Sequence, residues 1–243
     1  MKQVAPAVSV LERPILVELA DVALNGDLSL PADARGLVVF AHGSGSSRHS
    51  SRNRAVAEAL HQGRLGTLLL DLLTEHEERS DEVTAEFRFD IPLLGERVIA
   101  AVDWTAAHEP TSPLPLGLFG ASTGAAAALI AAAKRPKKVR AVVSRGGRPD
   151  LAADALEAVQ APTLLIVGGN DEPVIELNEQ AKRRMRTIAR IEIVPGATHL
   201  FEEHGALEQV ERLAADWFRE YLPRHAERGG ALDMLDGVAP GEK

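Results

Sequence analysis

Gly120-Ala121-Ser122-Thr123-Gly124 lies between a strand-like apolar run, residues 116–119, and an alanine-rich, helix-forming segment, residues 125–133. This order predicts a strand, a tight turn and a helix, with the serine at the turn. A serine held there has a strained backbone and an exposed hydroxyl, so residues without bulk are needed two positions to either side. The two glycines meet that need. The following helix favours negative charge beside the serine. Ser122 is therefore a candidate nucleophile, with a simple helix cap as the alternative.

Two later strand-like runs end in loops that carry an acid and a histidine. Residues 163–167 lead to Asp171, and residues 191–194 lead to His199. Because the carboxyl ends of the strands of an open α/β sheet form one edge, we expect Ser122, Asp171 and His199 to meet there. In such a triad the histidine takes the serine proton and the acid orients the imidazole. Alternatively, Asp171 only caps the next helix and His199 is a structural or exposed histidine.

The run Val38-Val39-Phe40-Ala41-His42-Gly43-Ser44-Gly45 resembles the oxyanion strand and loop of α/β-hydrolases. With residues 119–124 and 195–201, it makes the chain most similar to small, lidless dienelactone-hydrolase-like proteins over roughly residues 15–222. The resemblance implies an α/β fold, a three-layer α/β/α sandwich around a mostly parallel, doubly wound sheet, without a large cap domain. Dienelactone hydrolases carry a cysteine nucleophile, whereas this chain has no cysteine and has serine at the turn.

These observations predict a serine hydrolase that cleaves a carboxylic ester, lactone or thioester through an acyl-enzyme. The backbone N–H groups of Ser44 and Thr123 are the expected oxyanion donors, and His42 is expected to shape the loop. This chemistry needs no metal and no organic cofactor. Two alternatives stay open: an acyltransferase or perhydrolase with the same triad, and a catalytically silent binding protein of the same fold.

Charged loops surround the predicted catalytic edge. We expect some of their arginines to bind an acidic substrate group, with structural ion pairs to Asp81, Glu82, Glu86 or Asp150 as the alternative. The glycine- and serine-rich loop, residues 43–50, lacks the Gly-Lys-Ser/Thr ending of a phosphate-binding P-loop. Residues 74–90 are expected to form a solvated charged loop, or else to close over the pocket. The candidate arginines are Arg48, Arg52, Arg145 and Arg148.

Composition places the chain among single-domain proteins. Its 243 residues are 45% hydrophobic, enough for one substantial core. A formal net charge of −8 argues against nucleic acid as a partner, and the absence of cysteine excludes disulfides and thiolate metal sites. No apolar run approaches the roughly 18 residues of a membrane helix, and the N-terminal stretch is too short for a signal peptide. We therefore expect a cytoplasmic protein that acts on a small molecule, without a membrane partner.

The expected organisation has three parts: an N-terminal segment (1–14), a hydrolase domain (15–222) and a C-terminal tail (223–243). The tail is glycine-rich and charged, and we favour an ordinary frayed terminus. An apolar patch near Met234 leaves open a homo-oligomer in which the tail covers a partner subunit.

Asn25-Gly26-Asp27 is expected to form a turn between short strands. The expected strands are 15–20, 22–24, 28–30, 36–41, 67–70, 139–143, 163–167 and 191–194, besides the run before Ser122. The expected helices are 52–61, 91–108, 151–159, 174–185 and 207–222, besides the one after Ser122.

Overall fold

The computed structural model describes residues 9–222, and the predicted C-terminal tail lies outside the described residues. Eight strands form one sheet in the order β1-β2-β4-β3-β5-β6-β7-β8. β1 and β2 are antiparallel to their neighbours, and all pairings from β4 to β8 are parallel. The strands are β1 (Val10–Glu18), β2 (Ala23–Pro31), β3 (Gly36–Ala41), β4 (Leu65–Leu70), β5 (Leu116–Ala121), β6 (Val139–Arg145), β7 (Thr163–Gly168) and β8 (Ala189–Val194).

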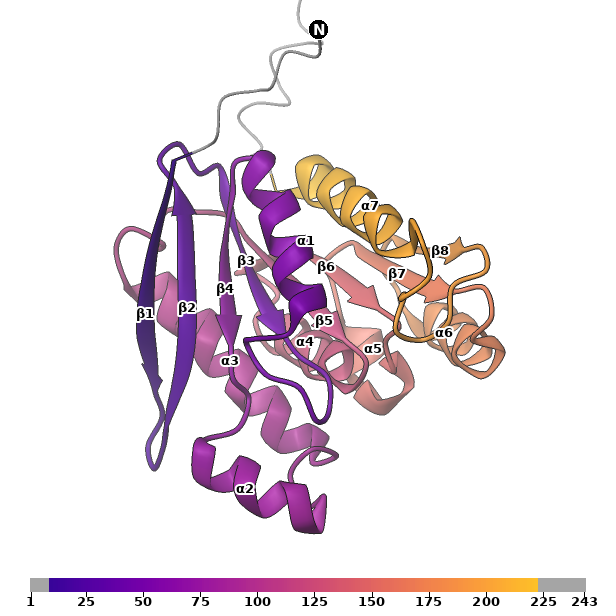
Figure 1. Cartoon of the computed structure of the whole chain (residues 1–243), viewed down its shortest axis with the longest axis horizontal. Coiled ribbons are helices and arrows are strands. Elements are labelled where there is room, and N and C mark those ends of the chain that lie inside the picture. Colours follow the sequence, from indigo (N-terminus) through magenta and orange to yellow (C-terminus); the bar gives the residue numbers. More distant parts are fainter. Residues whose placement is uncertain (1–8, 223–243) are drawn as a thin grey trace, which may run out of the picture.

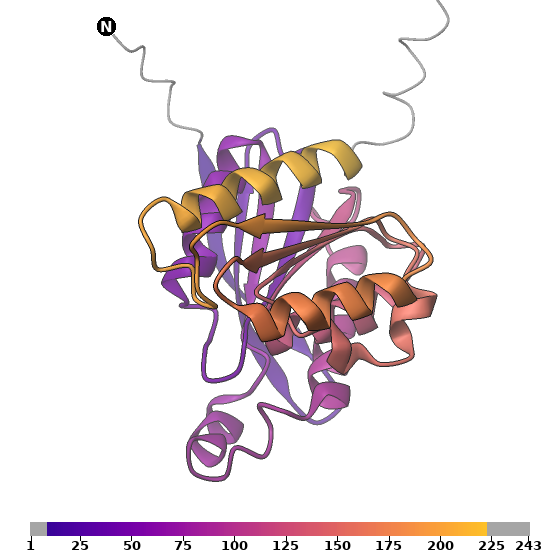
Figure 2. The same cartoon turned by 90° about the vertical axis from the view of Figure 1, so that its right-hand side faces the viewer.

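Helices cover both faces of this sheet, as Figures 1 and 2 show. One face carries α1 and α7, and the other carries the remaining long helices except α2, which lies beyond the carboxyl ends of the central strands (Figure 1). The three-layer, mostly parallel α/β architecture is therefore confirmed. The helices are α1 (Ser51–Gln62), α2 (Glu75–Thr84), α3 (Ile91–Ala107), α4 (Thr123–Lys134), α5 (Ala155–Ala158), α6 (Glu172–Arg184) and α7 (Ala206–Tyr221), with a short 3-10 turn, η1 (Pro149–Ala152).

The hydrophobic core has one layer on each face of the sheet. Every residue of β3 and of β5 is buried, as expected for apolar strands covered on both faces. Phe40 and Phe119 pack between the sheet and the α1 and α7 side, with their ring centroids 4.8 Å apart. On the opposite face, all alanines of α4 except Ala133 are fully buried, and their small side chains allow α4 to pack closely on α3. These packed layers hold the ends of β3 and β5 at fixed positions.

The N-terminal region differs from the sequence expectation. Asn25-Gly26-Asp27 does not form a turn, because these residues lie inside β2 and pair with residues 14–16 of β1. The alternation of Leu24, Gly26, Leu28 and Leu30 toward the buried face overrides the local turn chemistry. Gly26 serves close packing instead, since a Cβ there would lie 2.9 Å from Leu68. β1 begins at Val10, so pairing extends into the segment 1–14 that the sequence set apart.

Two further segments are also corrected. Residues 75–84 form helix α2 and not a solvated loop, because Thr74 and Glu77 make a capping box and Asp81 accepts hydrogen bonds from the backbone of Phe87 and Arg88. Residues 151–159 were expected to be one helix, but they form the end of η1 and the four-residue α5. Ala153 interrupts them, since it adopts a positive φ of 47°.

Candidate active site

The turn after β5 has the geometry that its sequence predicts. Ser122 has φ 50° and ψ −121°, a strained backbone conformation for a residue with a Cβ. A Cβ on Gly120 would lie 2.4 Å from the Cα of Ala125, and one on Gly124 would lie 2.3 Å from the carbonyl oxygens of Ala41 and His42. Both glycines are therefore required by close backbone contacts. The Ser122 side chain makes no helix-capping hydrogen bond, so the capping alternative does not describe its position.

Ser122, His199 and Asp171 form a continuous hydrogen-bonded chain. His199 Nε2 lies 3.3 Å from Ser122 Oγ, and His199 Nδ1 lies 2.7 Å from Asp171 Oδ2. Asp171 stands at the start of α6, but its side chain does not cap the helix. Its side chain is only 14% exposed, whereas that of His199 is 39% exposed. The structure thus brings together the three residues expected at one edge, in an arrangement that can activate a serine hydroxyl.

The loop after β3 passes directly beside this serine. A Cβ on Gly43 would lie 3.0 Å from the Cβ of Ser122, which fixes how closely the loop approaches. The next residue, Ser44, donates its backbone N–H to Thr123 Oγ1 over 3.0 Å. Thr123 is the first residue of α4 and is 4% exposed. The two residues expected to stabilise an oxyanion are therefore neighbours, but the Ser44 amide is directed at the Thr123 side chain.

His42 has the loop-shaping position that the sequence predicts. Its Nδ1 lies 2.8 Å from the carbonyl oxygen of Gly43, and its Nε2 accepts the backbone N–H of Leu72 over 2.9 Å. Only the neutral ring with the proton on Nδ1 satisfies both contacts. Burial also lowers the pKa of His42, which favours the same neutral form. Nδ1 thus fixes the local conformation of the loop after β3, and Nε2 joins that loop to the segment just after β4.

Three of the four candidate arginines form ion pairs. Arg148 pairs with Asp150 through two hydrogen bonds, as the structural alternative expects. Arg48 pairs with Asp71 and Asp27, which are partners that the sequence did not suggest. The third, Arg52, lies 3.2 Å from Glu202. These contacts neutralise the side chains that were expected to receive an acidic substrate group.

Arg145, the fourth candidate, lacks a carboxylate partner among residues 9–222. The residue is 8% exposed, and within residues 9–222 its guanidinium donates a single hydrogen bond, over 3.3 Å, to Asn53 Oδ1. Two of its nitrogens, Nε and Nη1, are buried without a partner. Burial and the nearby Arg52 lower the pKa of Arg145 to about 10. Arg145 ends β6 beside the nucleophile turn, since its carbonyl oxygen accepts the N–H of Ser122.

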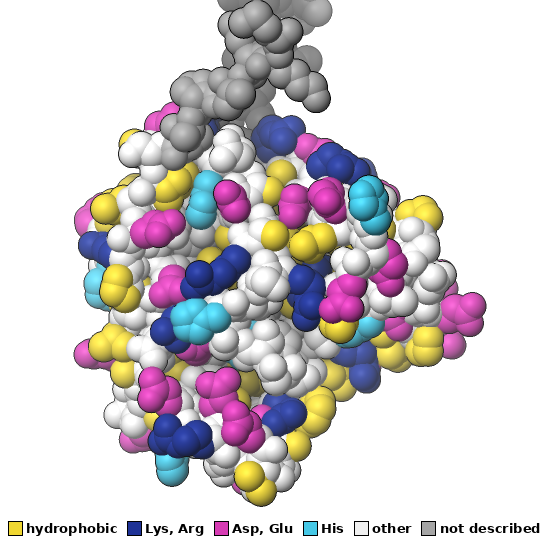
Figure 3. Space-filling view, in the orientation of Figure 1, with side chains coloured by type: hydrophobic (Ala, Val, Ile, Leu, Met, Phe, Trp, Pro, Cys, Tyr) yellow, Lys and Arg dark blue, Asp and Glu magenta, His cyan; other side chains and the backbone are white. Residues whose placement is uncertain are grey.

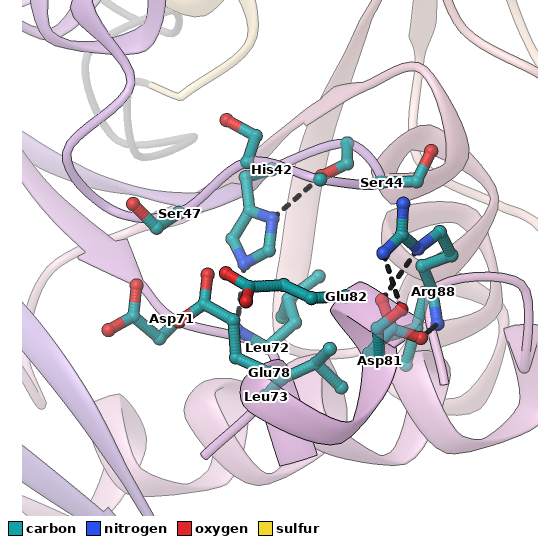
Figure 4. Close-up of a pocket in the computed structure, with 14 residues that line it drawn as sticks. His42, Ser44, Ser47, Asp71, Leu72, Leu73, Glu78, Asp81, Glu82 and Arg88 are labelled. Atoms are coloured by element: carbon teal, nitrogen blue, oxygen red, sulfur yellow. Dashed lines mark hydrogen bonds and ion pairs between the residues drawn. The ribbon is translucent and has the colours of Figure 1, made fainter. Parts of the chain in front are cut away.

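A cavity of about 290 Å³ opens beside the loop that carries Ser44. Figure 4 shows Ser44 and Ser47 on one side of it and the Asp81–Arg88 ion pair on the other. Its acidic wall comes largely from α2, which the sequence had not predicted as a helix; the capping-box pattern at residues 74–77 was the available signal. The side chains that line it include Leu72, Leu73, Leu94, Asp71, Glu78, Asp81 and Glu82.

The charged surface around the site contains both signs. Positive and negative side chains lie interspersed on the face that Figure 3 shows. Within residues 9–222, no group of three or more histidine, aspartate or glutamate side chains is placed to hold a metal ion. The helices of the same part of the chain include none that is long and apolar enough to cross a membrane.

Comparisons with known proteins agree with this geometry. The model of the dienelactone hydrolase family matches residues 71–222. The crystal structure of a dienelactone hydrolase from Anabaena variabilis is 56% identical, covers 88% of this chain and 99% of its own, and superposes with a TM-score of 0.86. Est1E from Butyrivibrio proteoclasticus is 17% identical, covers 85% of this chain and 98% of its own, and has a TM-score of 0.71, which shows a shared fold.

Two curated proteins from strains of Mycobacterium tuberculosis are also similar. Each is 55% identical over 211 residues, which is 87% of this chain and 47% of the relative. Their names describe them as phosphoribosyl transferases. The chain thus spans about half the length of the curated relatives that it matches.

Proposed function

Because the chain belongs to the dienelactone hydrolase family, we propose that it is a serine hydrolase that cleaves carboxylic esters, lactones or thioesters through an acyl-enzyme. The observation that carries the proposal is the continuous contact from Asp171 through His199 to Ser122. A serine hydroxyl is a poor nucleophile near neutral pH, and this contact supplies the base and the orienting carboxylate that it needs.

The residues have distinct roles in the proposed reaction. His199 Nε2 takes the proton as Ser122 Oγ attacks the substrate carbonyl, and the same nitrogen returns it to the leaving group. Asp171 holds the imidazole with its proton on Nδ1 and stabilises the imidazolium that forms. Water then enters, and His199 takes one of its protons as the water oxygen attacks the acyl carbon. The bond from that carbon to Ser122 Oγ breaks, His199 returns the proton to Oγ, and the carboxylic acid leaves. The backbone N–H of Thr123, the first residue of α4, donates to the developing oxyanion in this reaction.

The pocket beside Ser44 supports a small, neutral substrate. Its volume of about 290 Å³ lies at the lower end of ligand sites, and acidic side chains form much of its wall. An anionic group would meet Glu78 and Glu82, neither of which forms an ion pair among residues 9–222. We therefore place neutral esters and lactones ahead of acidic ones. The phosphoribosyl transferase name belongs to relatives about twice as long, and we assign no such transfer to this chain.

Covalent labelling tests the proposal directly. Wild-type protein is treated with a fluorophosphonate and analysed by intact mass, and turnover of p-nitrophenyl acetate is recorded in parallel. Ser122→Ala should lose both labelling and turnover, whereas Ser112→Ala, which removes an exposed hydroxyl before the start of β5, at the opposite end of that strand, should keep both. A wild type that is neither labelled nor active would favour a binding protein. Product analysis with added alcohol or peroxide distinguishes hydrolysis from acyl transfer and perhydrolysis.

A further inference from the structure

The backbone N–H of Ser44, an expected oxyanion donor, already donates to the Thr123 hydroxyl. A tetrahedral intermediate needs donors that are already in place when the negative charge develops. The Ser44 N–H is the donor that the loop after β3 would supply, but it is directed at Thr123 Oγ1 over 3.0 Å. A backbone N–H has one hydrogen, so this contact competes with direct donation to a substrate oxygen.

The Thr123 hydroxyl itself has an unused hydrogen. Among residues 9–222, its oxygen accepts from Ser44, and the hydroxyl donates to no protein group. A hydroxyl that accepts a hydrogen bond is polarised and becomes a better donor. The side chain is 4% exposed, so water competes little for this hydrogen. A buried donor without an acceptor is costly in a folded protein, and a substrate oxygen would satisfy it.

Close packing keeps the hydroxyl between the loop and the nucleophile turn. The missing Cβ of Gly124 brings the start of α4 against the carbonyl oxygens of Ala41 and His42. Gly43 also lies close to Ser122, since a Cβ on it would be 3.0 Å from the Ser122 Cβ. His42 Nδ1 contacts the Gly43 carbonyl within the loop, and its Nε2 accepts the N–H of Leu72, just after β4. The loop therefore has little freedom to turn the Ser44 amide elsewhere, whereas the Thr123 hydroxyl hydrogen rotates about a single bond.

We propose that the Thr123 hydroxyl is a catalytic oxyanion donor and that Ser44 acts through it. This inference rests on the proposed function. As Ser122 Oγ forms its bond to the carbonyl carbon, the π electron pair moves onto the carbonyl oxygen and His199 takes the serine proton. Thr123 then donates two hydrogen bonds to that oxygen, one from its backbone N–H and one from its hydroxyl. The hydroxyl keeps its proton throughout, and Ser44 orients and polarises it.

Three variants of Thr123 test this assignment. Thr123→Val has nearly the same shape without the hydroxyl, Thr123→Ala removes the hydroxyl with less bulk, and Thr123→Ser keeps it. Removing one oxyanion donor lowers kcat by about 100-fold or more in comparable sites, so Val and Ala should lose that much while KM changes little. Ser should retain most of the wild-type kcat. The melting temperature of each variant shows that it is folded.

A second readout separates an oxyanion donor from a residue that only braces the loop. Each protein is assayed with p-nitrophenyl acetate and with its thiono counterpart, in which sulfur replaces the carbonyl oxygen. Sulfur is a weak hydrogen-bond acceptor. Loss of a donor to that atom should therefore reduce kcat/KM for the oxygen ester much more than for the thionoester. Loss of a residue that only holds the loop in place should reduce kcat/KM for both esters equally.

The outcomes test the Thr123 hydroxyl donor separately from the proposed serine hydrolase activity. The ratio of kcat/KM for the oxygen ester to kcat/KM for the thionoester decides the question. A fall of this ratio in Thr123→Val and Thr123→Ala, with the wild-type ratio kept in Thr123→Ser, supports the hydroxyl as a donor. An active wild type with an unchanged ratio in the Val and Ala variants overturns the inference and leaves the proposed serine hydrolase intact. A wild type that is neither labelled at Ser122 nor active removes both.

Discussion

Asp171 Oδ2 lies 2.7 Å from His199 Nδ1, although the two residues follow different strands, β7 and β8. The contact exists because both strands are parallel and end at the same edge of the sheet. It fixes the proton on Nδ1 and leaves Nε2 to face Ser122.

Asp171→Asn should therefore lower kcat for p-nitrophenyl acetate by about 10⁴-fold, because an amide can hold the imidazole in the wrong tautomer. Glu172→Gln is the matched control: it neutralises the adjacent, exposed carboxylate and should leave kcat within a few-fold of wild type. Steady-state kinetics of the two variants give the answer. Similar losses in both would mean that local charge matters and that the Asp171–His199 contact does not.

The neutral state of His42 predicts a loss of stability in acid. Burial lowers its pKa in the folded protein, so the unfolded chain binds a proton that the folded chain resists. Stability is then present above the ordinary pKa of 6.5 and falls as the pH drops below it, by at most about 1.4 kcal/mol per pH unit. Urea unfolding of wild type and His42→Gln between pH 8 and pH 5 measures the difference.

The His42→Gln variant should show a shallower pH dependence. Partial burial also lowers the pKa of His61, so His61→Gln serves as the comparison for a half-buried histidine. Parallel curves for wild type and His42→Gln would contradict the assignment of His42 as a neutral, doubly bonded ring.

Arg145 predicts an unusual gain of stability on substitution. Burial lowers the pKa of Arg145 to about 10, which corresponds to a penalty on the order of 3 kcal/mol for the charged side chain. Between about pH 10 and the ordinary pKa of arginine the unfolded chain binds more protons, so stability rises with pH there. Below about pH 10 the penalty is complete. Arg145→Met should therefore raise the unfolding free energy at pH 7, while Arg140→Met, on the exposed side of β6, should change it little.

The same Arg145→Met variant tests the remaining acidic-substrate hypothesis. If Arg145 binds a substrate carboxylate, its KM for mono-p-nitrophenyl succinate should rise while that for p-nitrophenyl butyrate stays constant. We expect both KM values to stay constant. The unfolding free energy and the KM values of Arg145→Met thus distinguish two roles for Arg145. Either its buried charge only destabilises the fold, or it binds an acidic substrate group.

The acidic wall of the pocket predicts a charge preference in the wild type. Burial, followed by the charges of Asp71 and Glu82, raises the pKa of Glu78. p-Nitrophenyl butyrate should have a lower KM than mono-p-nitrophenyl succinate, which is of similar size but anionic. Replacing both Glu78 and Glu82 by glutamine should lower the ratio of the KM for the succinate ester to the KM for the butyrate ester several-fold. Each exposed charge contributes about 1 kcal/mol at contact distance. Glu96→Gln, on α3 and outside the lining of this cavity, is the control, and an equal change in the KM ratio there would remove the pocket from the explanation.

The sequence alone predicted the elements that depend on strong local patterns. The apolar run of β3 was placed correctly from Gly36 to Ala41, and the expected helix from residue 91 is α3, which Asp90 caps by accepting the backbone N–H of Leu93. The turn at Ser122 was equally clear, because two glycines are needed where backbones approach within van der Waals contact. These signals act over a few residues, so no distant contact is needed to interpret them.

Other features were decided by tertiary packing. The Asn25-Gly26 pair has the chemistry of a turn, yet burial of alternate side chains between β1 and β4 places it inside a strand. Arg145 was one of four equivalent arginines in the sequence, and only the fold shows that it is buried with no carboxylate partner in the described part of the chain. The Ser44–Thr123 contact joins residues that are far apart in the chain. The sequence determined which groups were available for catalysis, and the parallel sheet decided which of them meet, because strand ends converge whatever their separation along the chain.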